Sequence, residues 1–313
     1  MAVGTLDSDR LTLASLKGNP GRMRRERAIK ALFLLTAVMS IVVSALIVLV
    51  LARETWVFVS GVDPASLWTE GWFPRRGLYD VKTLFVGSVL VTAIGMAVAA
   101  PLGLGAAVFL SEYARPRVRR ILKPMLEILA GIPSVVLGFF ALNWISPQIV
   151  QRLNEEAALF NLMAAGIGVG ILVTPLVASV AEDAMRSVPR ALREASYGMG
   201  ARKVTTSVRV VIPAAVSGLV AAFILGISRA IGETMVVAIA AGASGGSLFS
   251  LDVFDRGQTM TAAMAALAGG TDAVKGAGLT FQSLFFVGSL LFVLTLALNL
   301  FADRFVRRVR QRY

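Results

Sequence analysis

Apolar residues form long blocks along this chain, and short segments rich in basic residues separate the blocks. A block of about 20 apolar residues has the length that crosses the hydrocarbon core of a bilayer as an α-helix. The clearest block reads ALFLLTAVMSIVVSALIVLVL and contains no charged residue. We therefore predict six membrane-spanning α-helices, at residues 31–51, 84–110, 122–145, 161–180, 213–241 and 281–302.

Two apolar stretches need a separate interpretation. The block at 31–51 is too long for the apolar region of a cleavable signal, and no small-residue cleavage site follows it. We expect it to be a retained anchor. The stretch MTAAMAALAGG at 260–270 is too short to cross a bilayer. We expect it to lie at the membrane interface or to re-enter the membrane.

The composition agrees with a polytopic membrane protein of the all-α class. Of the 313 residues, 56% are hydrophobic, and the mean hydropathy is +0.75. Only 16% are charged, against about 25% in ordinary soluble domains. A soluble domain of this length would not need so much apolar material.

Basic residues are distributed unevenly between the two sides of these spans. Segments 1–30, 112–124, 182–209 and 303–313 carry 7, 5, 6 and 5 of the 31 Lys and Arg residues. The alternate segments 52–82, 146–160 and 242–280 carry 4, 1 and 2 of them. The one remaining basic residue is Arg229, inside the fifth span. The positive-inside rule then places both termini in the cytoplasm, as an even number of spans requires.

Several classes of function are disfavoured. The net charge of +12 is divided among short loops at span ends, where orientation and anionic lipid headgroups explain it better than nucleic-acid binding. The chain has no Cys and no His, which removes disulfides, thiol chemistry and most transition-metal sites. It has no G-x-x-x-x-G-K-[ST] loop, so we expect no ATP site in this chain.

The segment SVPRALREASYGMGARKVTTSVRVVIP, residues 187–213, predicts a short amphipathic helix in a loop. Val188, Ala191, Leu192 and Ala195 recur on one helix face. Ser187 is a candidate cap at the start, and Gly200 suits a left-handed stop. On periodicity alone, this helix fits a surface helix lying against lipid headgroups.

The spacing within this segment resembles the EAA loop of ABC-importer permeases. That pattern is E-A-A, three residues, G, nine residues, and I-x-L-P. Glu194, Ala195, Gly200 and Pro213 fit it in register, Ser196 replaces the second Ala, and Val210 and Ile212 are apolar replacements. The resemblance implies a coupling helix that docks into a groove of a separate ATPase subunit.

Two further stretches are similar to the PstC-type permease subunits of bacterial phosphate importers. They are LSEYARPRVRRILKPMLEILAGIPSVVLGFFAL at 110–142 and SRAIGETMVVAIAAG at 228–242, and Leu137 departs from the Tyr frequent in that family. The resemblance implies a type I ABC-importer permease fold and a subunit that is not itself an enzyme. It also implies a PstA-type second permease, two copies of an ATPase that binds ATP and Mg, and an extracytoplasmic phosphate-binding protein. The expected location is the bacterial inner membrane.

Arg229 and Glu233 lie four residues apart inside the fifth predicted span. At this spacing they share a helix face and can pair, and a charge in a membrane normally faces the bundle interior or water. One interpretation is a buried ion pair that fixes helix packing. The other is an anion path in which Glu233 tempers the field of Arg229, and the family resemblance implies the second.

Other polar positions carry weaker expectations. Pro133 and Ser134 can break the helix of the third span, which is either a simple kink or a place where freed backbone groups face a water-filled path. Glu112 and Glu127 flank the basic loop, and we expect them to be structural partners of its Arg residues.

The expected organisation has five parts around one transmembrane domain. They are a basic cytoplasmic segment 1–30, an anchor 31–51, an extracytoplasmic loop 52–82, a five-span importer domain 83–303 with coupling loop 182–212, and a basic tail 304–313. The alternatives within the class are a PstA-type subunit or a permease for sulfate or molybdate. Outside it, the alternative is an ion channel or membrane sensor without an ATPase.

Overall fold

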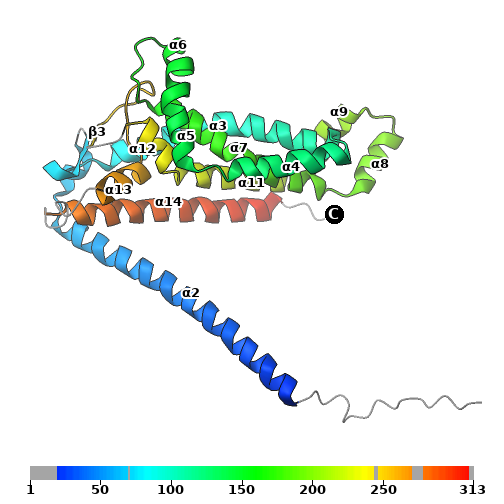
Figure 1. Cartoon of the computed structure of the whole chain (residues 1–313), viewed down its shortest axis with the longest axis horizontal. Helices are drawn as coiled ribbons and strands as arrows, with labels where there is room; N and C mark the ends of the chain where they lie inside the picture. The colour runs from blue at the N-terminus through cyan, green and yellow to red at the C-terminus, as the bar shows by residue number, and fades with distance from the viewer. Residues whose placement is uncertain (1–19, 70, 243–245, 270–277, 310–313) are drawn as a thin grey trace, which may run out of the picture. The chain divides into compact units, whose positions relative to one another are not determined.

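A computed structural model describes residues 20–69, 71–242, 246–269 and 278–309, which are almost entirely helical (Figure 1). The chain divides into two compact units, Met1–Arg53 and Glu54–Tyr313. Helix α2, Pro20–Gly61, begins in the first unit and ends in the second. It extends beyond the predicted anchor, 31–51, at both ends. The rest of this description concerns the second unit.

The helices confirm the expected all-α membrane architecture. In the described part of the chain, five helices are long and apolar enough to cross a membrane, and a bent pair supplies a sixth. They are Met23–Gly61, Val81–Tyr113, Ser134–Leu153, Leu162–Arg186, Thr280–Val306, and the pair Lys203–Ala214 with Val216–Ile231.

The third span lies later in the chain than the prediction of 122–145. Helix α4, Pro116–Ala130, ends before the sequence Gly131-Ile132-Pro133, and the span itself begins at Ser134. It consists of α5 (Ser134–Phe140), a π-helical segment η4 (Ala141–Val150) and α6 (Gln151–Leu153). Pro133 disfavours helical geometry at the preceding residue, which explains the break. The predicted helix break at Pro133 is therefore present, and α4 is a separate element.

The fifth span also differs from its predicted limits of 213–241. It starts with α9 (Lys203–Thr206), the π-helical η5 (Ser207–Val211) and α10 (Ile212–Ala214), then bends by 73° into α11 (Val216–Ile231). Pro213 lies two residues before the bend and removes one backbone hydrogen bond from the ladder. After α11 the chain breaks at Gly232, and α12, Met235–Ala240, forms a separate short helix.

Close packing of α3, Val81–Val108, against α7, Leu162–Arg186, forms the centre of this unit (Figure 1). Glycines line the contact, because a Cβ added to Gly170 would lie 2.7 Å from the backbone oxygen of Gly95. Helix α11 packs against both, and α14, Thr280–Val309, packs against α11. Dispersion over such close contacts is the force that holds membrane helices together, since lipid is as apolar as the helix surface.

One end of this unit carries a small sheet, and we call it the sheet end. Strand β1, Gly71–Phe73, pairs antiparallel with β2, Leu78–Tyr79, and with β3, Ser247–Leu248. The amide of Ala158 donates to the carbonyl of Phe254. The segments 52–82, 146–160 and 242–280 therefore meet on one side, as the charge distribution requires of loops that share a compartment.

The remaining elements of the sheet end are short. The 3₁₀ turns η1, Pro64–Trp68, and η2, Pro74–Arg76, precede the two strands of the first loop. Helix α13, Met260–Ala268, follows β3 and buries Met260, Thr261, Ala262, Ala263 and Leu267. The predicted non-spanning stretch at 260–270 is thus a buried helix over most of its length. Helix α8, Arg190–Gly198, lies with α9 at the opposite end, the α8 end (Figure 1).

Candidate functional site

The predicted pair in the fifth span forms, but at a helix break. Arg229 lies in the last turn of α11, and Glu233 lies after that helix has ended at Ile231. A guanidinium nitrogen of Arg229 is 3.6 Å from a carboxylate oxygen of Glu233. The Arg229 side chain is 53% exposed, whereas that of Glu233 is 3% exposed. The two partners therefore occupy different environments.

The carboxylate of Glu233 caps the helix that follows it. Its Oε1 atom accepts hydrogen bonds from the backbone amides of Met235 at 3.2 Å and Val236 at 3.5 Å, at the start of α12. These amides belong to the helix terminus that has no intrahelical partner. The backbone oxygen of Glu233 accepts a bond of 2.8 Å from the hydroxyl of Thr261 on α13. Helices α12 and α13 thus both hold Glu233 in place.

Arg229 keeps much of its charge free of these contacts. Glu233 is its one ion-pair partner among the residues that the structure describes. A half-exposed guanidinium in a membrane span is expected to face water or another protein surface, because lipid gives it no partner. The position at the C-terminus of α11 also favours a cation. The arrangement offers an anion a fixed positive charge, with a buried carboxylate behind it.

The break in the third span is linked to this site through helix packing. Helix α5 packs on α12, where a Cβ added to Gly138 would lie 3.1 Å from Ile239 and from the backbone oxygen of Met235. Pro133 is exposed and Ser134 half-buried at the start of α5. Leu137 is buried, so at this position the chain uses its side chain for packing. The two broken spans therefore share one packing unit.

The predicted short helix of the segment 187–213 is present at the α8 end, as α8. Glu194 and Ala195 are exposed on α8, and the hydroxyl of Ser196 lies 2.9 Å from that of Thr206. Gly200 has a φ of 78°, which confirms the left-handed stop, and Pro213 is exposed in α10. The expected cap is wrong, because Ser187 is the C-cap of α7 and its hydroxyl donates to the backbone oxygen of Ala184, while Pro189 is the N-cap residue of α8.

Arg193 fixes this helix to the ends of two spans. It forms an ion pair of 2.9 Å with Glu112, which lies in η3 (Phe109–Tyr113) directly after α3. It also donates to the backbone oxygens of Met185 at 2.8 Å and Val188 at 2.7 Å, at the end of α7. Glu112 therefore pairs with α8 and not, as we expected, with the basic loop.

Two apolar side chains near the turn after α8 are exposed, beside the exposed charge of Glu194. Met199, directly before Gly200, is 89% exposed, and Val204, four residues after Gly200, is 61% exposed. Val188 is buried and Leu192 half-buried on the other side. The amphipathic helix thus uses one edge for its own chain and leaves another available to a partner.

A second charged cluster, which the sequence interpretation missed, ties α4 to α7. The fully buried carboxylate of Glu182 lies 2.6 Å from Arg119, 2.9 Å from Lys123 and 3.8 Å from Arg186. Lys123 also lies 2.7 Å from Asp183. Partial burial alone lowers the pKa of Lys123, but hydrogen bonds to Asp183 and Glu182 and their charges outweigh it and raise that pKa above 10.5. The sequence did contain a signal for this cluster, because the acidic pair Glu182-Asp183 lies at the end of an apolar helix.

In the described part of the chain, Glu127 does not pair with the Arg residues of the basic loop, contrary to our expectation. No ion pair of Glu127 occurs among the described residues, although it lines a surface hollow of about 420 Å³ with basic residues of α4. Arg119 and Lys123 of the predicted basic loop pair instead with Glu182 on α7, 63 and 59 residues further along the chain. The role expected for Glu127 as a partner of the loop is therefore wrong.

Comparison with known families identifies the chain. Residues 99–311 match the family described as binding-protein-dependent transport system inner membrane component, and the chain belongs to this family. The Bacillus subtilis probable ABC transporter permease YqgH is 37% identical over 59% of this chain and 60% of its own length.

Two Mycobacterium tuberculosis proteins are also similar. The phosphate transport system permease PstC 1 is 32% identical, over 75% of each chain. The phosphate transport system permease PstA 1 is 33% identical, over 64% of each chain.

Solved structures show the same fold at low sequence identity. A bacterial ABC transporter that imports the acidic polysaccharide alginate matches 92% of this chain and 100% of its own, with a TM-score of 0.58 and 13% identity. The MetNI methionine ABC transporter matches 74% of this chain and 96% of its own, with a TM-score of 0.53 and 20% identity. The fold is that of type I ABC-importer permeases, as the sequence predicted.

Proposed function

We propose that this chain is a PstC-type permease subunit of an ATP-driven phosphate importer. The observation that carries the proposal is the half-exposed Arg229 beside a capped, buried Glu233, in a chain whose relatives include phosphate permeases. The PstC-type relative matches a larger share of the chain than the PstA-type relative, which favours the first over the second. Arg229 and Glu233 belong to the phosphate pathway, with Pro133 and Ser134 at the neighbouring helix break.

Arg229 serves this pathway as a fixed charge rather than as a tight binding site. A phosphate ion that leaves water needs a positive field, and it must also leave the site again for transport to continue. The buried carboxylate of Glu233 reduces the field that the ion meets. Its own position does not depend on the ion, because the amides of α12 and the hydroxyl of Thr261 already hold it.

The α8 segment transmits the work of a separate ATPase subunit. That subunit binds ATP and Mg, and this chain supplies no catalytic residue and binds no nucleotide. Glu194, Ala195, Ser196, Gly200 and Pro213 form the docking segment. The bonds from Arg193 to Glu112 and to the end of α7 pass its movement to α3 and α7, so motion at the ATPase reaches the packed centre of the unit.

The assembled importer has a PstA-type second permease, two ATPase copies and an extracytoplasmic phosphate-binding protein. The α8 end and both chain termini face the cytoplasm of a bacterial cell, and the sheet end faces the binding protein. The clustering of the basic segments 112–124 and 182–209 at the α8 end supports this orientation. The organisation into segment 1–30, anchor 31–51, loop 52–82, domain 83–303 and tail 304–313 follows from it.

The decisive experiment is phosphate uptake in cells that lack this chain. We expect phosphate uptake to fall and to recover when the chain is restored, with sulfate uptake unchanged. Loss of sulfate or molybdate uptake instead would assign the chain to a different oxyanion. Purification in mild detergent separates the proposal from a stand-alone channel, because only an importer permease copurifies with an ATPase.

A further inference from the structure

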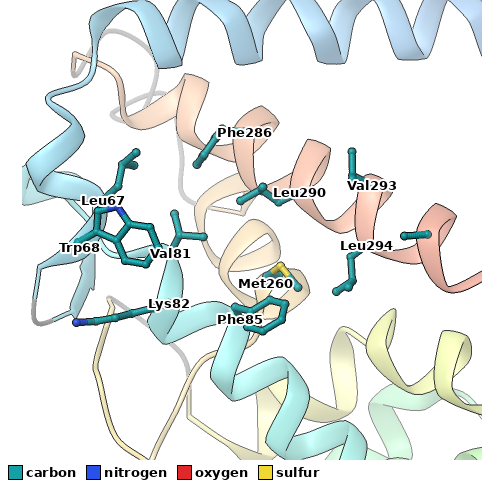
Figure 2. Close-up of a pocket in the computed structure, with 11 residues that line it drawn as sticks. Leu67, Trp68, Val81, Lys82, Phe85, Met260, Phe286, Leu290, Val293 and Leu294 are labelled. Atoms are coloured by element: carbon teal, nitrogen blue, oxygen red, sulfur yellow. The ribbon is translucent and has the colours of Figure 1, made fainter.

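An apolar pocket of about 530 Å³ lies at the sheet end, between α3, α13, α14 and η1 (Figure 2). Its walls are aliphatic and aromatic side chains, and Lys82 is the one charged residue that lines it. The lining residues are Leu67, Trp68, Val81, Lys82, Phe85, Met260, Phe286, Leu290, Val293, Leu294 and Ala297. Pockets of about 300–1,000 Å³ are the size that binds small ligands.

This pocket begins at the first turns of α3 and extends along α14 to the middle of that helix. Its walls include the first turns of α3 and the middle of α14, both of which are long enough to cross the membrane. Val293 is 60% exposed and Phe85 is 45% exposed, so the pocket is open on the outer surface of the helices. Trp68, at the end of η1, is 72% exposed. Trp and Lys at the end of a span mark the level of the lipid headgroups.

The charge of Lys82 has no carboxylate partner in the described part of the chain. Its ammonium lies 5.0 Å from the ring centre of Phe249, which places it at the rim of the pocket. The neighbouring carboxylate of Asp80 is fully buried and accepts a bond from the hydroxyl of Thr83 instead. Among the described residues, no carboxylate therefore compensates this cation at the apolar pocket.

We propose that this pocket binds an anionic phospholipid, with one acyl chain among the apolar side chains and the headgroup phosphate at Lys82. The lipid satisfies both parts of the site, because its chain matches the walls and its phosphate matches the ammonium. An apolar helix of another subunit would fill the walls and leave Lys82 without a counter-charge. Trp68 packs against the lipid at headgroup level.

The test is the lipid content of the assembled transporter after purification in mild detergent, measured by native mass spectrometry. Reconstitution in equal amounts of phosphatidylglycerol and phosphatidylethanolamine gives both lipids the same opportunity to bind. We expect retained phosphatidylglycerol in the unmodified complex. Lys82→Gln should reduce the preference for phosphatidylglycerol about fivefold, since a lysine near the surface contributes about that factor. Ala297→Trp should displace both lipids by filling the pocket.

Two matched variants control for charge and bulk. Arg152→Gln removes a cation outside the pocket, and Leu296→Trp adds an indole to an exposed position of α14 that does not line it. Both should retain lipid like the unmodified complex. If Lys82→Gln and Ala297→Trp both retain as much phosphatidylglycerol as the unmodified complex, the proposal is overturned.

A cross-linking experiment tests the same proposal without the Lys82 and Ala297 variants, in case one of them fails to assemble. The chain has no native Cys, so Leu290→Cys places one benzophenone probe inside the pocket. We expect cross-links to phospholipid. A cross-link to another subunit would show that a protein segment occupies the pocket and would refute the lipid assignment.

Discussion

Glu233 and Arg229 form an ion pair of 3.6 Å in which the carboxylate is buried and the guanidinium is half-exposed. Because their surroundings differ, we expect the two residues to have different roles. Glu233 also satisfies two backbone amides at the start of α12, whereas Arg229 has no second carboxylate in the described chain. Loss of the acid should therefore damage the fold, and loss of the base should damage transport.

The first prediction concerns this pair. Glu233→Leu leaves the buried amide of Val236 and the part-buried amide of Met235 without this acceptor, which should cost about 1–3 kcal/mol in the free energy of unfolding. Arg229→Gln should assemble normally while phosphate uptake falls by about tenfold or more, the effect of losing ~1.4 kcal/mol of attraction for the anion. Thermal unfolding in detergent and uptake by cells measure the two effects.

A double variant separates transport from packing. Glu233→Gln keeps an oxygen acceptor for the α12 amides, so Arg229→Gln with Glu233→Gln removes both charges and retains the cap. We expect this variant to copurify with the ATPase and still to take up phosphate about tenfold or more slowly than the unmodified protein. Full uptake by a well-expressed double variant would reduce the pair to a structural contact.

The second prediction concerns coupling through Arg193. Arg193→Lys keeps the charge but loses the planar fork that reaches Glu112, Met185 and Val188 together. We expect phosphate-stimulated ATP hydrolysis to drop while basal hydrolysis persists. Arg190→Lys, on the same helix without an ion pair in the described residues, is the matched control and should behave like the unmodified protein.

The third prediction concerns the cluster around Glu182. Arg119→Met with Lys123→Met removes the two nearest cations and leaves the fully buried carboxylate of Glu182 with Arg186 alone, at 3.8 Å, which should cost about 3–5 kcal/mol of stability. Glu182→Gln leaves only cations that are 25–44% exposed and reach water, so its cost should be smaller. Thermal unfolding of the three-residue series tests this order, and the opposite order would contradict it.

The same cluster gives stability a dependence on pH. Because the pKa of Lys123 is raised above 10.5 in the folded protein, its contribution is fully present below pH 10.5 and is lost as the pH rises through the raised pKa. Unfolding temperatures of the unmodified protein and of Lys123→Met should therefore converge above pH 10.5. A constant difference across that range would exclude this titration.

The fourth prediction concerns the turn after α8. A Cβ added to Gly200 meets no atom within 4 Å, so the cost of Gly200→Ala comes from its φ of 78° alone. We expect a loss of about 1–2 kcal/mol in local stability and weaker copurification of the ATPase. Gly198→Ala, also without a neighbour within 4 Å and in the last position of the helix, should retain coupling.

The fifth prediction concerns orientation. A reporter that is active only in the cytoplasm should be active when fused after Arg202 and silent after Ser66 or Gly246. The pairing of β1 with β3 places the last two positions in loops on one side. Activity at one of these loops and silence at the other would contradict the sheet as well as the topology.

Local patterns in the sequence determined the class of protein. Block lengths of apolar residues predicted the spans, the spacing from Glu194 to Pro213 predicted the coupling helix, and Pro133 predicted a break. The family resemblance rested on the same short stretches. Each of these signals depends on neighbours within about 20 residues, which share one helix or one turn, so the chain alone contains them.

Tertiary structure decided which charges meet. Arg193 pairs with Glu112 and Lys123 with Glu182 across 81 and 59 residues. Strand β1 pairs with β3 across 175 residues, counted from Trp72 to Ser247. After the break at Ile231, the carboxylate of Glu233 is buried at the N-terminus of α12, whereas Arg229 remains half-exposed. Periodicity cannot fix such contacts, because they depend on how α3, α7 and α11 pack, and that packing is set by shape complementarity between helices distant in the chain.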